Sequence, residues 1–204
     1  MVMTRREFKN FLLNHNPREV CEQHLFNDDV YLFDEKPFGE RGTFYDFRSG
    51  VAKIVETTPE SVFIVGSAKF GFSMNFNKSP LLKAFHSKSD LDLLIISEGK
   101  FEQIWADLRR ANALGGHSEL KEAHMRPIFE KFVFIEDKIE HKSTYLIKHT
   151  KLISEIRRFA SLKHRIKQKI NYRIYSALED ATNYHYRGIE ILSRSLMGPR
   201  GAAI

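Results

Sequence analysis

Two aspartates, Asp90 and Asp92, open an apolar run that continues to Ile96 near the middle of the chain. Side chains alternate along a strand, so these carboxylates project from one face if the run is extended. Neighbouring carboxylates repel each other unless a positive charge lies between them. Mg²⁺, or Mn²⁺ in its place, supplies such a charge, because hard divalent cations prefer oxygen ligands and are commonly shared with substrate phosphates. The pair predicts metal-assisted chemistry on a phosphorylated substrate; the alternative is a polar entrance to an ordinary strand.

A second apolar run at 62–65 ends in a Gly-Ser pair, Gly66 and Ser67. Glycine permits close backbone approach, and a serine at the start of a helix can cap it or bind phosphate. Lys69 and Ser73 follow on the same short segment and are expected to assist in phosphate binding, with the lysine acting as a point charge. An ordinary strand-to-helix turn with a solvated Lys69 is the alternative interpretation.

In combination, Gly66-Ser67 after one strand and Asp90-Leu91-Asp92 at the start of the next resemble the nucleotidyltransferase superfamily that includes DNA polymerase beta. The stretch 66–73 is similar to a group of small bacterial nucleotidyltransferase-like proteins, and the resemblance extends to Asn171–Ser176. It implies that the Gly-Ser turn receives the nucleotide phosphates and that the two aspartates hold the catalytic metals. It also implies transfer of an NMP from an NTP to a hydroxyl of an RNA, protein or nucleotide acceptor. Such proteins often belong to toxin–antitoxin or phage-defence systems, where a larger complex is a further partner.

The third carboxylate that this family takes from a later strand is not obvious. Glu130 lies inside the apolar run 128–135, which we expect to be a strand, and is the candidate third catalytic acid. Glu136 and Asp137 at the far end of that run are the other option, and all three acids are also explained as surface residues. Without a third acid, the chain is instead a binding module with a decayed site, acting as a sensor, antitoxin or complex subunit.

Basic residues dominate the stretch from Lys138 to Arg173, where eleven Lys and Arg face two acids. Such a density suggests a groove for an acidic partner such as an RNA or DNA strand, with Tyr172, Tyr175 and Tyr184 available for base stacking. A solvated helix face with its tyrosines in the core is the alternative. Because Arg173 and Tyr175 lie in the stretch that resembles the family, they are the candidate nucleotide contacts there.

The periodicity of apolar residues predicts the elements that position these side chains. We expect an α/β (α+β) fold: a small mixed-sheet nucleotidyltransferase core at 59–147, N-terminal helices at 1–58 packed on it, and a basic helical portion at 148–204, forming one compact unit. Strands are expected at 62–65, 90–96 and 128–135. Helices are expected at 4–14, from 17, from 44 to near 57–59, at 68–74, at 101–113, as one long helix or two over 148–170, and at 176–196. The remainder of the polar segment 73–89 is expected to be a loop near the pocket mouth.

Composition narrows the function further. The net charge of +6, with nine histidines besides, favours polyanionic partners. The single cysteine, Cys21, excludes an intrachain disulfide and is expected to be a buried residue in a reducing cytoplasm. No secretory signal and no run of about 20 apolar residues is visible, so we expect a cytoplasmic protein without a membrane partner. There is no Walker-type loop or dinucleotide fingerprint, and His141, His149 and His164 are assigned to the basic surface.

Overall fold

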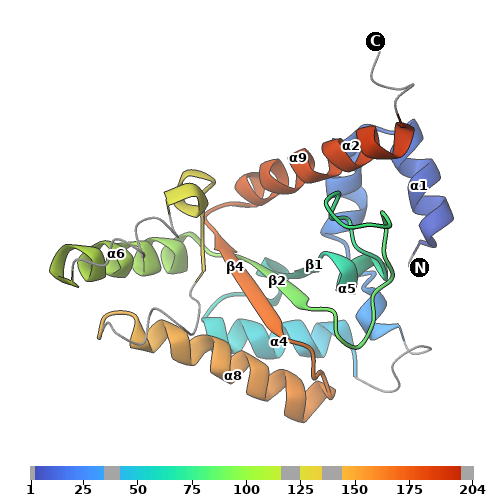
Figure 1. Cartoon of the computed structure of the whole chain (residues 1–204). Coiled ribbons are helices and arrows are strands. Elements are labelled where there is room, and N and C mark those ends of the chain that lie inside the picture. The colour runs from blue at the N-terminus through green and yellow to red at the C-terminus, as the bar shows by residue number, and fades with distance from the viewer. Residues whose placement is uncertain (1–2, 35–41, 116–124, 135–143, 199–204) are drawn as a thin grey trace.

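The structure, a computed structural model, describes residues 3–34, 42–115, 125–134 and 144–198 (Figure 1). Its centre is a four-stranded mixed sheet in the order β1-β2-β4-β3. β2 and β4 run parallel to each other, and each pairs antiparallel with an outer strand. The strands are β1 (Val62–Val65), β2 (Leu91–Ile96), β3 (Phe132–Val133) and β4 (Ile170–Tyr175).

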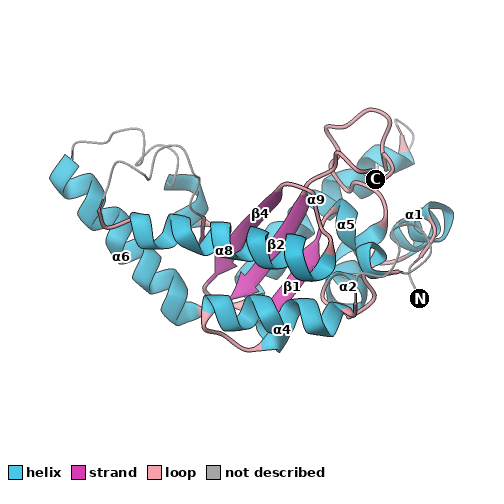
Figure 2. Cartoon of the chain, turned by 90° about the horizontal axis from the view of Figure 1, so that it is seen from below, coloured by secondary structure: helices cyan, strands magenta, loops and turns pink. Residues whose placement is uncertain are grey.

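Two long helices, α4 (Phe44–Val55) and α8 (Ile147–His164), cover one face of the sheet, as Figures 1 and 2 show from two directions. They approach closely at Gly50, where an added Cβ atom would lie 1.9 Å from the ring of Phe159. α6 (Glu98–Gly115) extends beyond the end of the sheet and contributes to the same core. The strand residues of that core are Val62, Ile64, Leu91, Leu93, Ile95, Val133, Ile170, Tyr172 and Ile174.

The opposite face of the sheet carries a second core and the remaining helices. Thr4 begins the first of them with a capping box, in which its side chain accepts from the Glu7 N–H and its own N–H donates to the Glu7 carboxylate. These helices are α1 (Arg5–Asn14), α2 (Pro17–Val20, continuing as a π-helix at Cys21–Leu25), α5 (Ser67–Phe70) and α9 (Leu178–Met197), and short 3₁₀ turns lie at Tyr31–Phe33 and Pro59–Ser61.

The expected mixed α+β fold with a small sheet is confirmed, and so are the strands at 62–65 and 91–96. The helix expected from Phe44 is present, but it ends at Val55, before the expected end near 57–59, because Glu56 takes a left-handed conformation. Cys21 is buried, as expected. The helix expected at 68–74 is shorter, because Gly71 takes a left-handed conformation and ends it at Phe70. Within the described ranges, no helix has the length and apolarity that crossing a bilayer requires.

The strand expected at 128–135 is wrong over most of its length. Residues 125–129 are helical, and Lys131 then takes a left-handed conformation with φ of 58°. That residue reverses the chain, so only Phe132 and Val133 pair with β4. Glu130 consequently lies on a turn and not within a strand. Glu136 and Asp137 fall outside the described residues.

The sequence predicts one long helix or two from Lys148 to Ile170; the structure has a single helix there that ends at His164, and residues 170–175 form β4. Arg165 takes a left-handed conformation at the end of α8, with φ of 52°, and breaks the helical period. Ile170, Tyr172 and Ile174 then alternate with less buried residues, the two-residue period of a strand. The C-terminal portion therefore supplies a central strand of the sheet as well as helices.

Two histidines assigned to the basic surface are buried. The ring of His149 lies 2.9 Å from the buried Asp107, and Lys148 binds the same carboxylate at 2.8 Å, which ties α8 to α6. Burial alone would raise the pKa of Asp107, but these two partners outweigh it and lower that pKa. His164 packs edge-on against the rings of Phe47 and Phe159. His141 lies outside the described residues.

Candidate functional site

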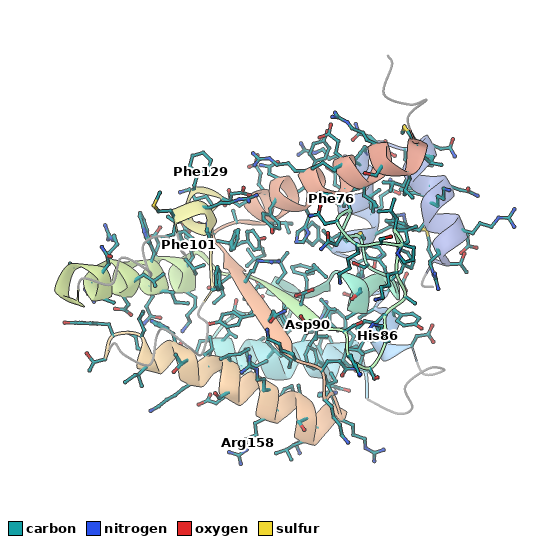
Figure 3. The ribbon with its side chains drawn as sticks, viewed as in Figure 1. Phe76, His86, Asp90, Phe101, Phe129 and Arg158 are labelled. Carbon is teal, nitrogen blue, oxygen red and sulfur yellow. The ribbon has the colours of Figure 1, made fainter. Side chains whose placement is uncertain are left out.

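Asp90 and Asp92 converge on one side chain of the neighbouring strand. Asp92 pairs with Asn171 of β4 in the parallel register. The Asn171 amide nitrogen donates to the Asp90 carboxylate at 3.3 Å and to the Asp92 carboxylate at 3.2 Å. Asp90 is exposed and Asp92 is half-buried. Figure 3 shows Asp90 at the point where the chain enters β2. The structure therefore brings the two aspartates together, as the strand alternation predicts.

The Gly-Ser bend after β1 lies directly against Asp92. Gly66 has a φ of +70°, a conformation that side chains other than glycine rarely adopt. A Cβ atom added at this position would lie 2.9 Å from an Asp92 carboxylate oxygen. Glycine is therefore required here for two reasons, the backbone conformation and the close approach of the carboxylate. Ser67 follows on the same bend and begins the single turn of α5.

A cavity of about 480 Å³ opens beside Asp92, between the sheet and α9. Gly66, Ser67 and Ser73 line it, as the sequence analysis predicts for a phosphate site. Its charged lining comprises four basic and two acidic residues, so its charge is positive overall. These residues are Lys78, Arg126, Arg173 and Arg187, with Asp92 and Glu130.

Two aromatic rings hold the Arg173 side chain in this cavity. Its guanidinium carbon lies 5.6 Å from the centre of the Phe132 ring and 5.3 Å from that of Tyr184. Two such cation–π contacts orient the group without neutralising it. No carboxylate of a described residue pairs with Arg173. Arg173 and Tyr184 both line the cavity. Arg173 is thus a fixed positive charge that lines the cavity, and its contact with a nucleotide stays a prediction.

Glu130 also lines the cavity, but it faces arginines and does not join the aspartate pair. Its carboxylate lies 3.4 Å from Arg126 and 3.5 Å from Arg187. Among the residues that the structure describes, no three acidic, histidine or cysteine side chains converge in a way that could hold a metal. The position beside the aspartates is taken by the Asn171 amide. The structure does not support Glu130 as the third acid.

Lys69 and Tyr175 lie away from the cavity. The Lys69 ammonium donates to the backbone carbonyl oxygen of Asn27 at 2.5 Å and to its side-chain oxygen at 2.6 Å. Lys69 is 1% exposed, and burial lowers its pKa to about 8. Tyr175 is 0% exposed and stacks on Phe132, so burial raises its pKa well above the usual value. Both side chains are buried and neither lines the cavity, so neither can contact a ligand there.

A smaller hollow of about 270 Å³ adjoins the first and contains Asp90. It shares Ser67, Ser73 and Lys78 with the larger cavity. The segment expected to be a loop at the pocket mouth forms most of its wall, which confirms that expectation. The other lining residues are Ser79, Lys83, Ala84, His86, Lys88 and Ser89.

The donor atoms at the aspartate pair fit a hard divalent cation. Mg²⁺ is usually bound by one or two carboxylates together with substrate phosphates and water. Asp90 and Asp92 offer those carboxylates, and the Asn171 side chain can turn its amide oxygen toward a cation in place of its nitrogen. The residues present therefore suit a metal that arrives with a nucleotide more than one that is held by the protein alone.

The sequence analysis missed several residues of this site. Asn171 lies within the stretch that resembles the family, yet it was not predicted to be a site residue, because no strand was predicted at 170–175. His185 and Arg187, two positions apart on α9, also line the cavity and were not predicted. Burial lowers the pKa of His185 to about 3, so its ring is neutral, and its buried Nε2 has no hydrogen-bond partner among the described residues. A pattern in the sequence does not distinguish these from ordinary helix residues.

Comparisons of the chain with protein-family models, with curated proteins and with solved structures give no match. A functional assignment therefore depends on the geometry of the two hollows and of the aspartate pair between them.

Proposed function

We propose that this protein is a Mg²⁺-dependent nucleotidyltransferase that transfers an NMP from an NTP to a hydroxyl group. The observation that carries the proposal is the convergence of Asp90 and Asp92 on Asn171, against the close bend at Gly66 and beside a positively charged cavity. Two carboxylates next to several cations suit a ligand that carries both a metal ion and phosphates. The resemblance of Gly66-Ser67 and the aspartate pair to the polymerase-beta superfamily supports the same reaction.

In the proposed reaction the acceptor oxygen forms a bond to the α-phosphorus of the NTP. The bond from that phosphorus to its bridging oxygen breaks, pyrophosphate leaves, and the hydroxyl proton passes to solvent. When bound, Mg²⁺ neutralises phosphate charge and holds the reacting groups in line.

The residues of the chain have distinct roles in this proposal. Asp90 and Asp92 hold the metal, and Asn171 keeps their carboxylates together. Arg173 binds the triphosphate as a charge already fixed by two aromatic rings, so little conformational entropy is lost on binding. The hydroxyls of Ser67 and Ser73 donate hydrogen bonds to phosphate oxygens.

A second function, a nucleotide-binding module without catalysis, is favoured by one specific observation. The place beside the aspartates where a third acid would complete the metal site holds the neutral Asn171. Catalysis of nucleotidyl transfer depends mainly on positioning and on charge neutralisation, so an absent ligand slows the reaction. In this case the protein binds a nucleotide with its metal and acts as a sensor, an antitoxin or a subunit.

Incubation with each α-³²P-labelled NTP, Mg²⁺ or Mn²⁺ and total RNA or protein acceptors separates the two functions. We expect label transfer that is lost in Asp90→Ala and in Asp92→Ala. Glu155→Ala, which changes an exposed acid on α8, is the matched control and should keep full activity. Nucleotide binding without transfer under either metal would support the binding module. Absence of both binding and transfer would overturn both proposals.

A further inference from the structure

The two aspartates face different hollows. Asp92 lines the larger cavity and Asp90 lines the smaller one, while Asn171 holds both carboxylates. The hollows meet at Ser67, Ser73 and Lys78, which line both. A reaction between two substrates requires this kind of arrangement, with one compartment for each and the metal-binding groups at their junction. The larger compartment suits the nucleotide, so the smaller one is available for the second substrate.

The smaller hollow carries positive charge that the protein does not neutralise. Lys78, Lys83 and Lys88 line it and are all exposed. None of these three lysines forms an ion pair with a residue that the structure describes. Among the lining residues Asp90 is the one acid, and His86 lies beside it, as Figure 3 shows. Three unpaired cations around one carboxylate favour an anionic ligand.

The positive charge continues on the far side of Asp90. The segment that leads into β4 carries Lys167 and Lys169, and both are exposed. The backbone carbonyl of Lys169 accepts a hydrogen bond of 2.8 Å from the Leu91 N–H, so this segment lies next to Asp90. Lysines on both sides of Asp90 suit a ligand with several anionic groups in a row more than a single phosphate.

The residues that line the smaller hollow suit phosphate as the anionic group of its ligand. Four serines line the hollow with the lysines, and arginine is absent from its lining. Lysine and serine are common ligands of the phosphate oxygens of nucleic acids. Apart from His86 the lining has no aromatic ring on which a base could stack. This composition favours recognition of a phosphodiester backbone without selection of base sequence.

We propose, on the premise of the nucleotidyl transfer proposed above, that the smaller hollow binds the hydroxyl end of a single-stranded nucleic acid. Its phosphates lie along Lys78, Lys83 and Lys88, and its terminal hydroxyl lies at Asp90. The hydroxyl oxygen attacks the α-phosphorus of the nucleotide, pyrophosphate leaves, the proton passes to solvent, and the strand becomes one nucleotide longer.

Fluorescence anisotropy with a labelled 12-nucleotide single strand, as RNA and as DNA, tests the proposal without NTP or metal. Lys83→Glu/Lys88→Glu is compared with Lys53→Glu/Lys151→Glu, which makes the same change of net charge at exposed positions on α4 and α8. We expect at least a tenfold loss of affinity for the first variant and less than a threefold loss for the control. The slope of log affinity against log salt should also fall by about 1.4 or more, because each phosphate contact to a single strand contributes about 0.7.

Several results would overturn the proposal. Equal losses in the two variants would indicate non-specific attraction or a site on α8. Poly-glutamate that competes with the strand at equal charge concentration would assign the hollow to an acidic protein. If the glutamate variant does not fold by circular dichroism, Lys83→Gln/Lys88→Gln replaces it, and unchanged strand binding in that variant also overturns the proposal.

The outcome is distinguishable from failure of the proposed function. Binding of a fluorescent NTP with Mg²⁺ should be unchanged in Lys83→Glu/Lys88→Glu, since these lysines do not line the larger cavity. Strand binding with the expected mutational pattern but no transfer would refute the transferase and leave the nucleic-acid site. Transfer to another acceptor with no strand binding would refute the nucleic-acid site alone.

Discussion

Replacement of Asn171 by aspartate tests whether the three side chains at the start of β2 and β4 form one unit. The substitution removes two hydrogen bonds to carboxylates and introduces a third negative charge. An oxygen at the position of the amide nitrogen would lie 3.3 Å from Asp90 and 3.2 Å from Asp92. The variant should therefore be unstable by itself and should gain more than the wild type from a divalent cation.

The size of the effect follows from the distances and from the exposure of the groups. Two unit charges at about 3.3 Å repel by about 1 kcal/mol in water and about 5 kcal/mol at an effective dielectric constant of about 20. Asp90 is exposed, and the side chains can rotate apart, so the lower value is closer. With the lost hydrogen bonds, we expect a loss of about 2–4 kcal/mol in the free energy of unfolding, which lowers Tm by roughly 5–15 °C.

Differential scanning fluorimetry in EDTA and in increasing Mn²⁺ measures both effects. A cation at about 100 times its Kd restores about 2.7 kcal/mol to a protein that binds it only when folded. Asn183→Asp is the matched control, because Asn183 is exposed on α9 and its side chain makes no hydrogen bond with a described residue. If Asn171→Asp is as stable as the wild type in EDTA and responds to Mn²⁺ no more than the control does, the three side chains do not form the unit described above.

Three further predictions concern single residues. Gly66→Ala should lower the free energy of unfolding by about 1–3 kcal/mol in urea titrations and should abolish transfer. The φ of this residue is +70°, and the added Cβ atom would meet the Asp92 carboxylate. Full activity of this variant would refute the close approach. Glu130→Gln should raise NTP affinity by about two- to fivefold in a binding titration. The reason is that Arg187 is released from a partly exposed ion pair worth about 0.5–1 kcal/mol. Loss of transfer in this variant would instead identify Glu130 as the third acid. The pKa of Lys69 falls from 10.5 to about 8 on folding. Between these two pH values the unfolded chain binds more protons than the folded protein. The contribution of Lys69 to the free energy of unfolding therefore rises with pH in this range. The wild type should therefore gain about 1–2 kcal/mol relative to Lys69→Met between pH 7.5 and 9.5 in urea unfolding, and a constant difference would contradict the buried charge.

The site could be predicted where it depends on local pattern. Strand alternation placed Asp90 and Asp92 on one face, and the need for a tight bend identified Gly66. Both features depend on backbone geometry within a few residues, which the sequence expresses directly.

The rest of the site depends on contacts between distant segments. Asn171 reaches the aspartates because β4 lies beside β2, and that pairing joins residues about 80 positions apart. The strand itself was not predicted, since Ile166 and Ile170 continue the four-residue spacing of the apolar residues of α8. Lys69 appeared to be a phosphate ligand, yet it turns to Asn27 on a segment 42 residues away. Tertiary packing decides such cases, and local periodicity does not report it.

The aspartate pair alone is not an argument for a ligand, because the Asn171 amide satisfies both carboxylates within the protein. The argument comes from the surrounding cations. Arg173, Lys83 and Lys88 have no carboxylate partner among the described residues, and all three line the hollows. A free metal ion would interact favourably with the aspartates only, and a free phosphate with the cations only. A nucleotide that carries its metal brings opposite charges to both groups at once, so the charge distribution favours the complex over either component.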